Sequence, residues 1–168
     1  MLSSIPPESG NYALHLTLAD TQSLQVGRWG KFEFPSGEYV YLGSALGPGG
    51  LQARLSRHLR GDGRSHWHID WLRAEAVVTG YYYLITNQRL ECKWSQALIN
   101  TPNASVPVPR FGASDCNNHE SPCLAHLVRL NHGGYQETIQ EILSMTSGLE
   151  VSYYDFTSDS QSELGYIE

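Results

Sequence analysis

The stretch of residues 37–60 constrains the fold of this chain more than any other part of its sequence. Its first half reads Gly-Glu-Tyr-Val-Tyr-Leu-Gly-Ser-Ala and alternates between aromatic and aliphatic positions. Tyr39 and Tyr41 fall on one face of an extended chain, and the aliphatic residues beside them fall on the other, which predicts a β-strand. The run Gly-Pro-Gly-Gly that follows must end this strand.

The second half of this stretch predicts an amphipathic helix. Leu51, Leu55 and Leu59 are four residues apart and form one apolar stripe. Arg54 and His58 are also four apart, so they share a helix face at the border of the stripe. Two phenols at a strand end thus lie beside a guanidinium and an imidazole, groups that can hold a phosphate and move a proton. An ordinary strand followed by a helix with a solvated basic face would give the same pattern.

The remaining chain predicts a small α+β domain. Its length of 168 residues and its apolar fraction of 40% are typical of one globular core. Short strand-like segments follow one another in the first part of the chain, so we predict a mainly antiparallel β-sheet flanked by helices. The expected strands are 11–19, 24–28, 31–34, 39–43 and 77–86, and the expected helices are 51–60, 65–76, 89–99 and 135–145.

Composition divides the chain into three expected parts. Residues 1–9 contain Pro6-Pro7 and predict a flexible arm, and residues 10–134 form the main domain. Residues 135–168 predict an acidic, partly mobile extension, because they hold seven acidic residues and no Lys or Arg. The net charge of −6 argues against simple nucleic-acid binding, but residues 51–73 hold five Arg against two Asp. Basic charge is therefore local to the candidate site.

The sequence also bounds the setting of the protein. No stretch approaches ~18 uninterrupted apolar residues, so we expect no membrane span. Residues 1–9 lack the basic start and apolar core of a signal peptide. Three Cys residues do not form a disulfide scaffold, and we expect a reducing, cytoplasmic location.

Several motifs in order resemble the GIY-YIG nuclease superfamily, and most of all its Uri-type endonuclease branch. The resemblance covers roughly residues 10–130. The motifs are Gly-x-Tyr at 10–12, Tyr-Leu-Gly at 41–43, Gly-Ser-Ala at 43–45, Arg-x-x-x-His at 54–58, His-Trp-His-Ile-Asp at 66–70 and Phe-Gly-Ala-Ser-Asp-Cys at 111–116. The resemblance implies a metal-dependent DNA endonuclease that acts in DNA repair or restriction-like processing.

The resemblance also implies roles for particular residues. Tyr12 would activate the attacking water with help from His58 or Tyr41, Arg54 would grip the phosphate, and Glu91 would hold one Mg²⁺ or Mn²⁺. Together with the local basic charge, the resemblance predicts that three more arginines contact nucleic acid: Arg57, Arg60 and Arg64. The alternative is a non-catalytic nucleic-acid-binding module of the same fold, which would act with a DNA-repair partner.

Two clusters of potential metal ligands stay ambiguous at the level of sequence. His66, His68 and Asp70 would align as ligands on a strand, whereas on a helix they would serve as structural groups, with Asp70 orienting a histidine. The second cluster, Cys116, Cys123 and His126 with His119 nearby, could form a zinc site. Buried or partly exposed thiols are the alternative for this cluster.

Overall fold

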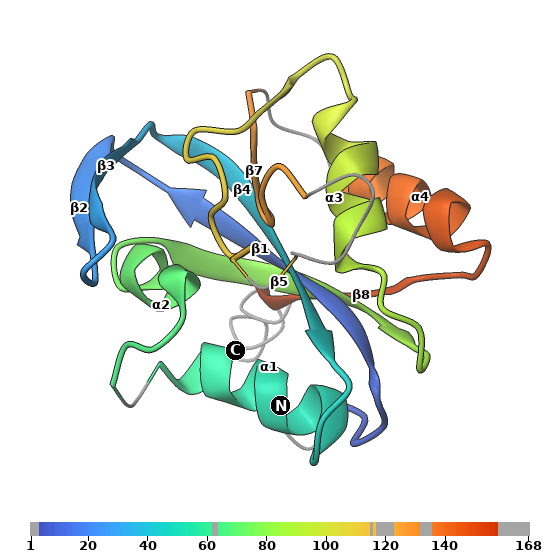
Figure 1. Cartoon of the computed structure of the whole chain (residues 1–168). Helices are drawn as coiled ribbons and strands as arrows, with labels where there is room; N and C mark the ends of the chain where they lie inside the picture. The colour runs from blue at the N-terminus through green and yellow to red at the C-terminus, as the bar shows by residue number, and fades with distance from the viewer. Residues whose placement is uncertain (1–3, 62–63, 115, 117–122, 132–135, 158–168) are drawn as a thin grey trace, which may run out of the picture.

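The computed structural model describes residues 4–61, 64–114, 116, 123–131 and 136–157 (Figure 1). Eight strands and four helices are present in these residues. In chain order they are β1 (Gly10–Leu18), β2 (Gln22–Val26), β3 (Gly30–Phe34), β4 (Gly37–Ala45), α1 (Gly50–Arg60), α2 (His68–Arg73), β5 (Val77–Ile85), α3 (Glu91–Ile99), β6 (Ala104–Ser105), β7 (Leu127–Leu130), α4 (Gln136–Ser147) and β8 (Ser152–Asp155).

Six of the strands form one sheet in the order β6-β7-β4-β1-β5-β8. Every neighbouring pair in this sheet is antiparallel. The α+β class with an antiparallel sheet is therefore confirmed, as is the central place of β1 and β4. Their register sets Tyr12 opposite Gly43 and Leu14 opposite Tyr41, which brings the two tyrosine motifs side by side.

β2 and β3 do not lie between β1 and β4, although the order of strands in the sequence suggested a simple succession. They form a separate two-stranded sheet. The reason is burial: β1 and β4 are buried on both faces along most of their nine residues, whereas β2 and β3 alternate between exposed and half-buried positions. Only strands with two apolar faces can occupy the centre of a covered sheet.

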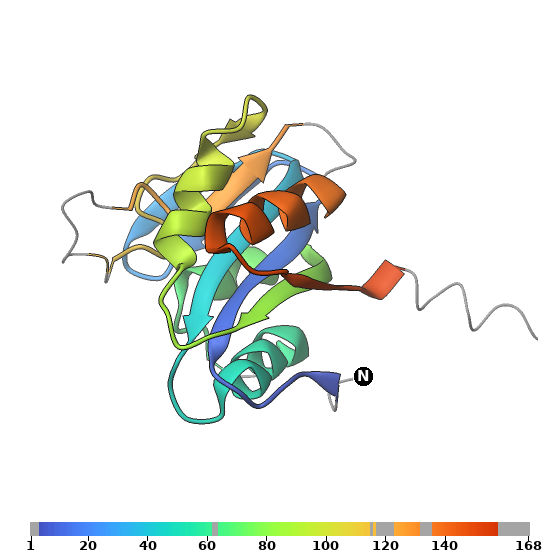
Figure 2. The ribbon, with the colours of Figure 1, turned by 90° about the vertical axis from the view of Figure 1, so that its right-hand side faces the viewer.

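Helices cover both faces of the six-stranded sheet. α1 and α2 lie on one face, and α3 and α4 lie on the other (Figures 1 and 2). Alternation along β1 divides its side chains between the two layers: Tyr12 and Leu14 pack with Leu51 and Leu55 of α1, and Ala13 packs in the cluster of α3 and α4. The face of β1 and β4 that carries the tyrosines is thus the face that α1 covers.

Both ends of the described chain belong to the fold, which corrects the expected boundaries. In the expected arm, Ile5 is 2% exposed, and the Glu8 carbonyl accepts a hydrogen bond of 2.9 Å from the Leu51 amide. In the expected extension, Ile139 of α4 is buried and β8 pairs with β5 at the edge of the sheet. The expectations for residues 1–3 and 158–168 lie outside the described residues.

Two of the expected helices begin later than the sequence suggested. α2 starts at His68, because the Asp70 carboxylate accepts hydrogen bonds from the backbone amides of His66 and Trp67 and holds that segment extended before the first turn. α3 starts at Glu91. The backbone amide of the preceding residue, Leu90, donates a hydrogen bond to the Asn11 side chain of β1. Among the residues that the structure describes, no helix is long and apolar enough to cross a membrane.

Candidate active site

One cleft of about 820 Å³ receives side chains from β1, β4, α1 and α3. Tyr12, Tyr41 and Arg54 line it, as does Glu91 at the start of α3. His58 lies just behind this wall and contacts Tyr12. The structure therefore brings together the four residues expected to act in catalysis and the residue expected to bind a metal.

Tyr12 and His58 form a buried pair at the base of the cleft. The Tyr12 hydroxyl and His58 Nε2 are 2.9 Å apart, and their rings are tilted by 47°. Gly43, directly opposite Tyr12 on β4, makes this pairing sterically feasible. A Cβ atom at Gly43 would lie 2.4 Å from the Tyr12 hydroxyl, so any larger residue would displace the phenol.

The side chains of Tyr12, Tyr41 and His58 are neutral at physiological pH. Burial raises the pKa of Tyr12 well above its usual value of about 10, with a further increase from Tyr41 and a partial decrease from Arg54. Burial also raises the pKa of Tyr41. Burial lowers the pKa of His58 to about 3, against the opposing influence of Asp70. The pair can therefore share a proton, but neither group carries a charge before a ligand arrives.

Trp67 organises the basic face of α1, a role that sequence reasoning missed. The guanidinium carbon of Arg54 lies 4.4 Å from the centre of the Trp67 ring, and that of Arg57 lies 3.8 Å from it. The Trp67 ring also packs against His58, with ring centres 5.6 Å apart. Its position inside the His-Trp-His-Ile-Asp motif was the only feature of the sequence that could have indicated this role of Trp67.

The arginines of α1 differ in their surroundings. Arg57 donates two hydrogen bonds to the Asp70 carboxylate, at 3.3 and 2.9 Å. No carboxylate among the described residues pairs with Arg54, which leaves its guanidinium facing the cleft. Arg60 ends α1, and the exposed Arg64 follows it; neither lines the cleft.

In the described structure, His68 and Asp70 of the His-Trp-His-Ile-Asp motif make contacts that hold neighbouring segments in place. His68 Nδ1 accepts a hydrogen bond of 3.2 Å from the Gly112 amide, and its ring stacks on Trp29 with centres 4.5 Å apart. Burial alone would raise the pKa of Asp70, yet hydrogen bonds from Arg57 and from two backbone amides lower it. Asp70 thus positions Arg57 and the start of α2, and not a histidine ring. His66 is exposed.

Glu91 presents a buried carboxylate at the cleft wall. Its side chain is enclosed, with 3% of the residue exposed. Oε1 accepts hydrogen bonds from Ser44 at 3.3 Å and from Arg89 at 3.1 Å. Oε2 is buried and has no hydrogen-bond partner among the described residues. A buried carboxylate oxygen without a partner is costly unless a ligand or cation completes it.

Asn11 fixes the position of Glu91 from the neighbouring strand. Its side chain is fully buried. Its Oδ1 accepts a hydrogen bond of 2.9 Å from the Leu90 amide, and its Nδ2 donates one of 2.7 Å to the Gln88 carbonyl. The middle residue of the Gly-Asn-Tyr motif therefore ties β1 to the first turn of α3. Sequence reasoning assigned it no role.

A second group of polar side chains lies on the same cleft wall, beyond Glu91. Cys92, Cys116, Cys123 and His126 each offer one ligand atom, and these atoms lie within 4.8 Å of one another. Such a group could hold a metal ion. Cys92 and Cys123 are also joined as a disulfide, with Cα atoms 5.6 Å apart. Cys92 was absent from the expected cluster, and His119 lies outside the described residues.

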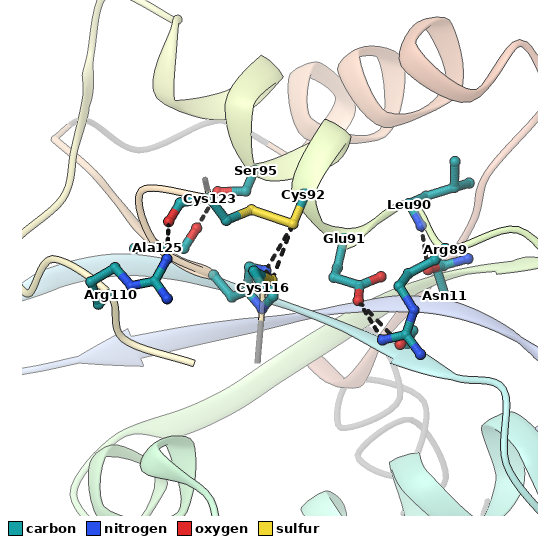
Figure 3. The surroundings of a disulfide bond; sticks show 12 residues. Asn11, Arg89, Leu90, Glu91, Cys92, Ser95, Arg110, Cys116, Cys123 and Ala125 are labelled. Carbon is teal, nitrogen blue, oxygen red and sulfur yellow. Dashed lines mark hydrogen bonds and ion pairs between the residues drawn. A yellow bond between two sulfur atoms is a disulfide. The ribbon is translucent and has the colours of Figure 1, made fainter. Parts of the chain in front are cut away.

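Figure 3 shows how these two features are arranged. The Glu91 carboxylate points toward Arg89, and the disulfide lies on the opposite side, with Cys116 below it. Cys116 and His126 also line the cleft. Burial lowers the pKa of His126, partly offset by the Glu91 carboxylate. The His126 imidazole beside these sulfur atoms is therefore neutral at pH 7.

Fold and site together define a small α+β protein with a six-stranded antiparallel sheet and a polar cleft at the tyrosine-bearing strands. The family model described as "Domain of unknown function DUF123" matches residues 11–149, and the chain belongs to this family. The match runs from β1 to just beyond α4 and includes every cleft residue named above. Comparison with curated proteins and with solved structures gives no match.

Proposed function

We propose that this protein is a metal-dependent DNA endonuclease of the GIY-YIG type. The observation that carries the proposal is the convergence of Tyr12, Tyr41, Arg54 and Glu91 on one cleft, with His58 bonded to Tyr12. These five residues are the ones that the family resemblance selects, and they come from four separate elements. A chance resemblance in local sequence would not gather them at one place.

Hydrolysis of a phosphodiester would use the Tyr12–His58 pair as a proton relay. Water attacks phosphorus and releases a proton to the Tyr12 oxygen, while the Tyr12 hydroxyl proton moves to His58 Nε2. The bond from phosphorus to the leaving oxygen breaks, this oxygen takes a proton from solvent, and His58 then returns its extra proton to solvent. The negative phosphate near the pair favours the protonated imidazole, which burial alone disfavours. Arg54 binds two phosphate oxygens through its planar guanidinium and stabilises the charge of the transition state. No covalent intermediate forms.

Glu91 is suited to hold one Mg²⁺ or Mn²⁺. Its buried Oε2 lacks a partner among the described residues, and a hard carboxylate oxygen is what these cations prefer. Mg²⁺ commonly takes only one or two carboxylates and completes its shell with water and substrate phosphates. When bound, such a cation would neutralise the charge that develops on the leaving oxygen.

One observation favours the alternative, a nucleic-acid-binding module without cleavage activity. Among the described residues that line the cleft, Glu91 is the only carboxylate. A cation held by a single protein ligand depends heavily on the substrate for its remaining ligands. In this reading Arg54 and the arginines further along α1 would bind the phosphate backbone, and a DNA-repair partner would supply the chemistry.

The decisive experiment is a cleavage assay on labelled DNA and RNA oligonucleotides, single- and double-stranded, with Mg²⁺, Mn²⁺ or EDTA. We expect metal-dependent cleavage of DNA. Arg54→Ala should lower kcat on the order of 100-fold or more, because it removes one oriented transition-state contact. Arg54→Lys should restore activity only in part, because an ammonium group cannot match the planar fork.

Lys31→Ala is the matched control. It removes one positive charge from the exposed hairpin strand β3, outside the cleft, and should leave kcat unchanged. Thermal unfolding of each variant establishes that the fold persists. DNA binding without cleavage under every metal condition would support the binding module and contradict the nuclease. Wild-type turnover in Arg54→Ala would remove the main support for a catalytic cleft.

A further inference from the structure

Four soft or borderline metal ligands meet at the wall of the cleft from three separate segments. Cys92 lies in the first turn of α3, Cys116 follows the turn after Phe111, and Cys123 and His126 precede β7. Cys116, Cys123 and His126 are all buried. A disulfide between Cys92 and Cys123 accounts for two of these groups. It gives no reason for a third thiol and an imidazole to point at the same spot.

The spacing of the ligand atoms fits a single tetrahedral ion. The Cys92 sulfur lies 3.3 Å from the Cys116 sulfur and 3.4 Å from His126 Nε2. The Cys116 sulfur lies 3.3 Å from the same nitrogen. Zinc with Zn–S bonds of about 2.3 Å and Zn–N bonds of about 2.0 Å sets its ligand atoms roughly 3.5–3.8 Å apart. For these three ligand atoms, shifts of a few tenths of an ångström suffice to admit the ion. The Cys92 and Cys123 sulfurs, which are bonded to each other in the disulfide, must in addition move apart after reduction to the spacing of two zinc ligands.

The segments that carry these ligands are fixed by hydrogen bonds of their own. The His126 amide donates to the Phe111 carbonyl at 2.8 Å, and the Leu42 amide of β4 donates to the His126 carbonyl at 2.9 Å. The Arg110 side chain donates to the Cys123 carbonyl at 3.1 Å, and the Ser95 hydroxyl of α3 donates to the Ala125 carbonyl. The backbone thus presents the four ligands in one arrangement, as a built metal site requires.

We propose that the reduced chain binds one Zn²⁺ through the thiolates of Cys92, Cys116 and Cys123 and Nε2 of His126. With four protein ligands the site is closed, which is typical of structural zinc. It is chemically separate from the Glu91 site, because sulfur and imidazole select zinc whereas an isolated carboxylate suits Mg²⁺ or Mn²⁺. Cys92 directly follows Glu91, so the zinc would fix both the start of α3 and the adjoining cleft wall.

Zinc and the disulfide are alternative states of the same thiols. A dithiol reductant converts the Cys92–Cys123 disulfide into two thiols with two electrons and two protons and is itself oxidised to a disulfide. Zn²⁺ then replaces the thiol protons, and up to three protons are released to buffer. Zinc binding in turn protects the thiols from oxidation. This inference does not depend on the proposed nuclease activity.

The test is metal analysis of the full chain, expressed and purified with a thiol reductant and then desalted. We expect about one zinc per chain, three titratable thiols after denaturation without reductant, and a lower melting temperature after zinc is removed by a chelator. Reconstitution with Co²⁺ should give thiolate-to-cobalt charge-transfer absorption and the intense visible bands of a tetrahedral site. None of these readouts involves catalysis.

Cys116→Ser separates the two states of the cluster. A zinc site loses a ligand and should lose its cobalt spectrum, whereas a disulfide between the other two cysteines is untouched. His126→Asn should act like Cys116→Ser, and His66→Asn, at an exposed histidine outside the cluster, should leave zinc content unchanged. If either variant fails to fold, Co²⁺ titration of the reduced wild-type chain decides. Negligible zinc, one titratable thiol per chain and no cobalt charge transfer would overturn the proposal.

Discussion

At the scale of single residues, His58 makes the stability of this protein depend on pH. Burial lowers its pKa in the folded state to about 3, whereas in the unfolded chain an imidazole titrates near about 6.5. Between these values the unfolded chain binds the extra proton. The neutral imidazole therefore contributes stability that is fully present above about pH 6.5 and is lost as the pH falls toward 3.

The substitution His58→Gln keeps a polar side chain at this position but removes the group that titrates, so it should make the stability less dependent on pH. Between pH 7 and pH 5 the wild-type free energy of unfolding should fall by about 2 kcal/mol more than that of His58→Gln. Chemical denaturation at the two pH values measures the difference. His66→Gln, at an exposed histidine, should behave like the wild type. Equal pH steps in all three proteins would mean that His58 is accessible to protons in the folded state.

At the scale of elements, the contact between β1 and the start of α3 decides where Glu91 lies. The Asn11 side chain accepts a hydrogen bond from the Leu90 amide and donates one to the Gln88 carbonyl. Leu90 is the N-cap residue of α3, and its own side chain forms no capping hydrogen bond. A single buried amide thus couples the strand that carries Tyr12 to the helix that carries Glu91. Tyr12 follows Asn11 directly, so both sides of the cleft depend on one short strand segment.

Removal of that amide should affect both stability and metal binding. Asn11→Ala should lower the free energy of unfolding by roughly 1–3 kcal/mol, because it leaves the Leu90 amide and the Gln88 carbonyl without their partner. It should also weaken Mn²⁺ binding several-fold, measured by calorimetric titration, because Glu91 loses its anchor. Asn100→Ala, at the exposed opposite end of α3, is the matched control and should change neither quantity appreciably. Lost stability with unchanged Mn²⁺ affinity would make Asn11 a purely structural residue.

At the scale of the whole molecule, acidic residues concentrate after the cleft-forming part of the chain. Residues 135–168 hold seven of the seventeen acidic residues and no Lys or Arg. Part of this segment is integral to the fold: Ile139 and Leu143 of α4 and Val151 before β8 are buried. The remaining acidic residues follow Thr157. They are Asp159, Glu163 and Glu168.

Two truncations should therefore behave differently. A chain that ends at residue 134 should lose cooperative unfolding, because it exposes the apolar face that α4 and β8 cover. A chain that ends at Thr157 should keep its melting temperature and bind DNA a few-fold more tightly at low salt, because three negative charges are gone. Fluorescence anisotropy at two salt concentrations measures the affinity. Unchanged low-salt affinity would show that these three charges do not influence binding.

Local patterns in the sequence were sufficient for much of the fold and for part of the site. The alternation at residues 39–42 and the four-residue spacing of Leu51, Leu55 and Leu59 identified β4 and α1, because each pattern repeats with the geometry of its own element. The pattern of residues 39–60 by itself placed Tyr41 near Arg54 and His58, whereas Tyr12 and Glu91 could be added to this site only through the family resemblance. The structure then brought these side chains together.

The tertiary structure alone decided which distant segments meet. The alternating pattern of β2 and β3 is compatible with an edge strand or a separate hairpin, and only the packing of the whole chain makes them a separate sheet and pairs β1 with β4. The same holds for the ion pair of Arg57 with Asp70 and for the arrival of Cys92 beside the other thiols. Such contacts depend on how complementary surfaces pack across the whole chain, and the spacing of residues within one segment carries no information about them.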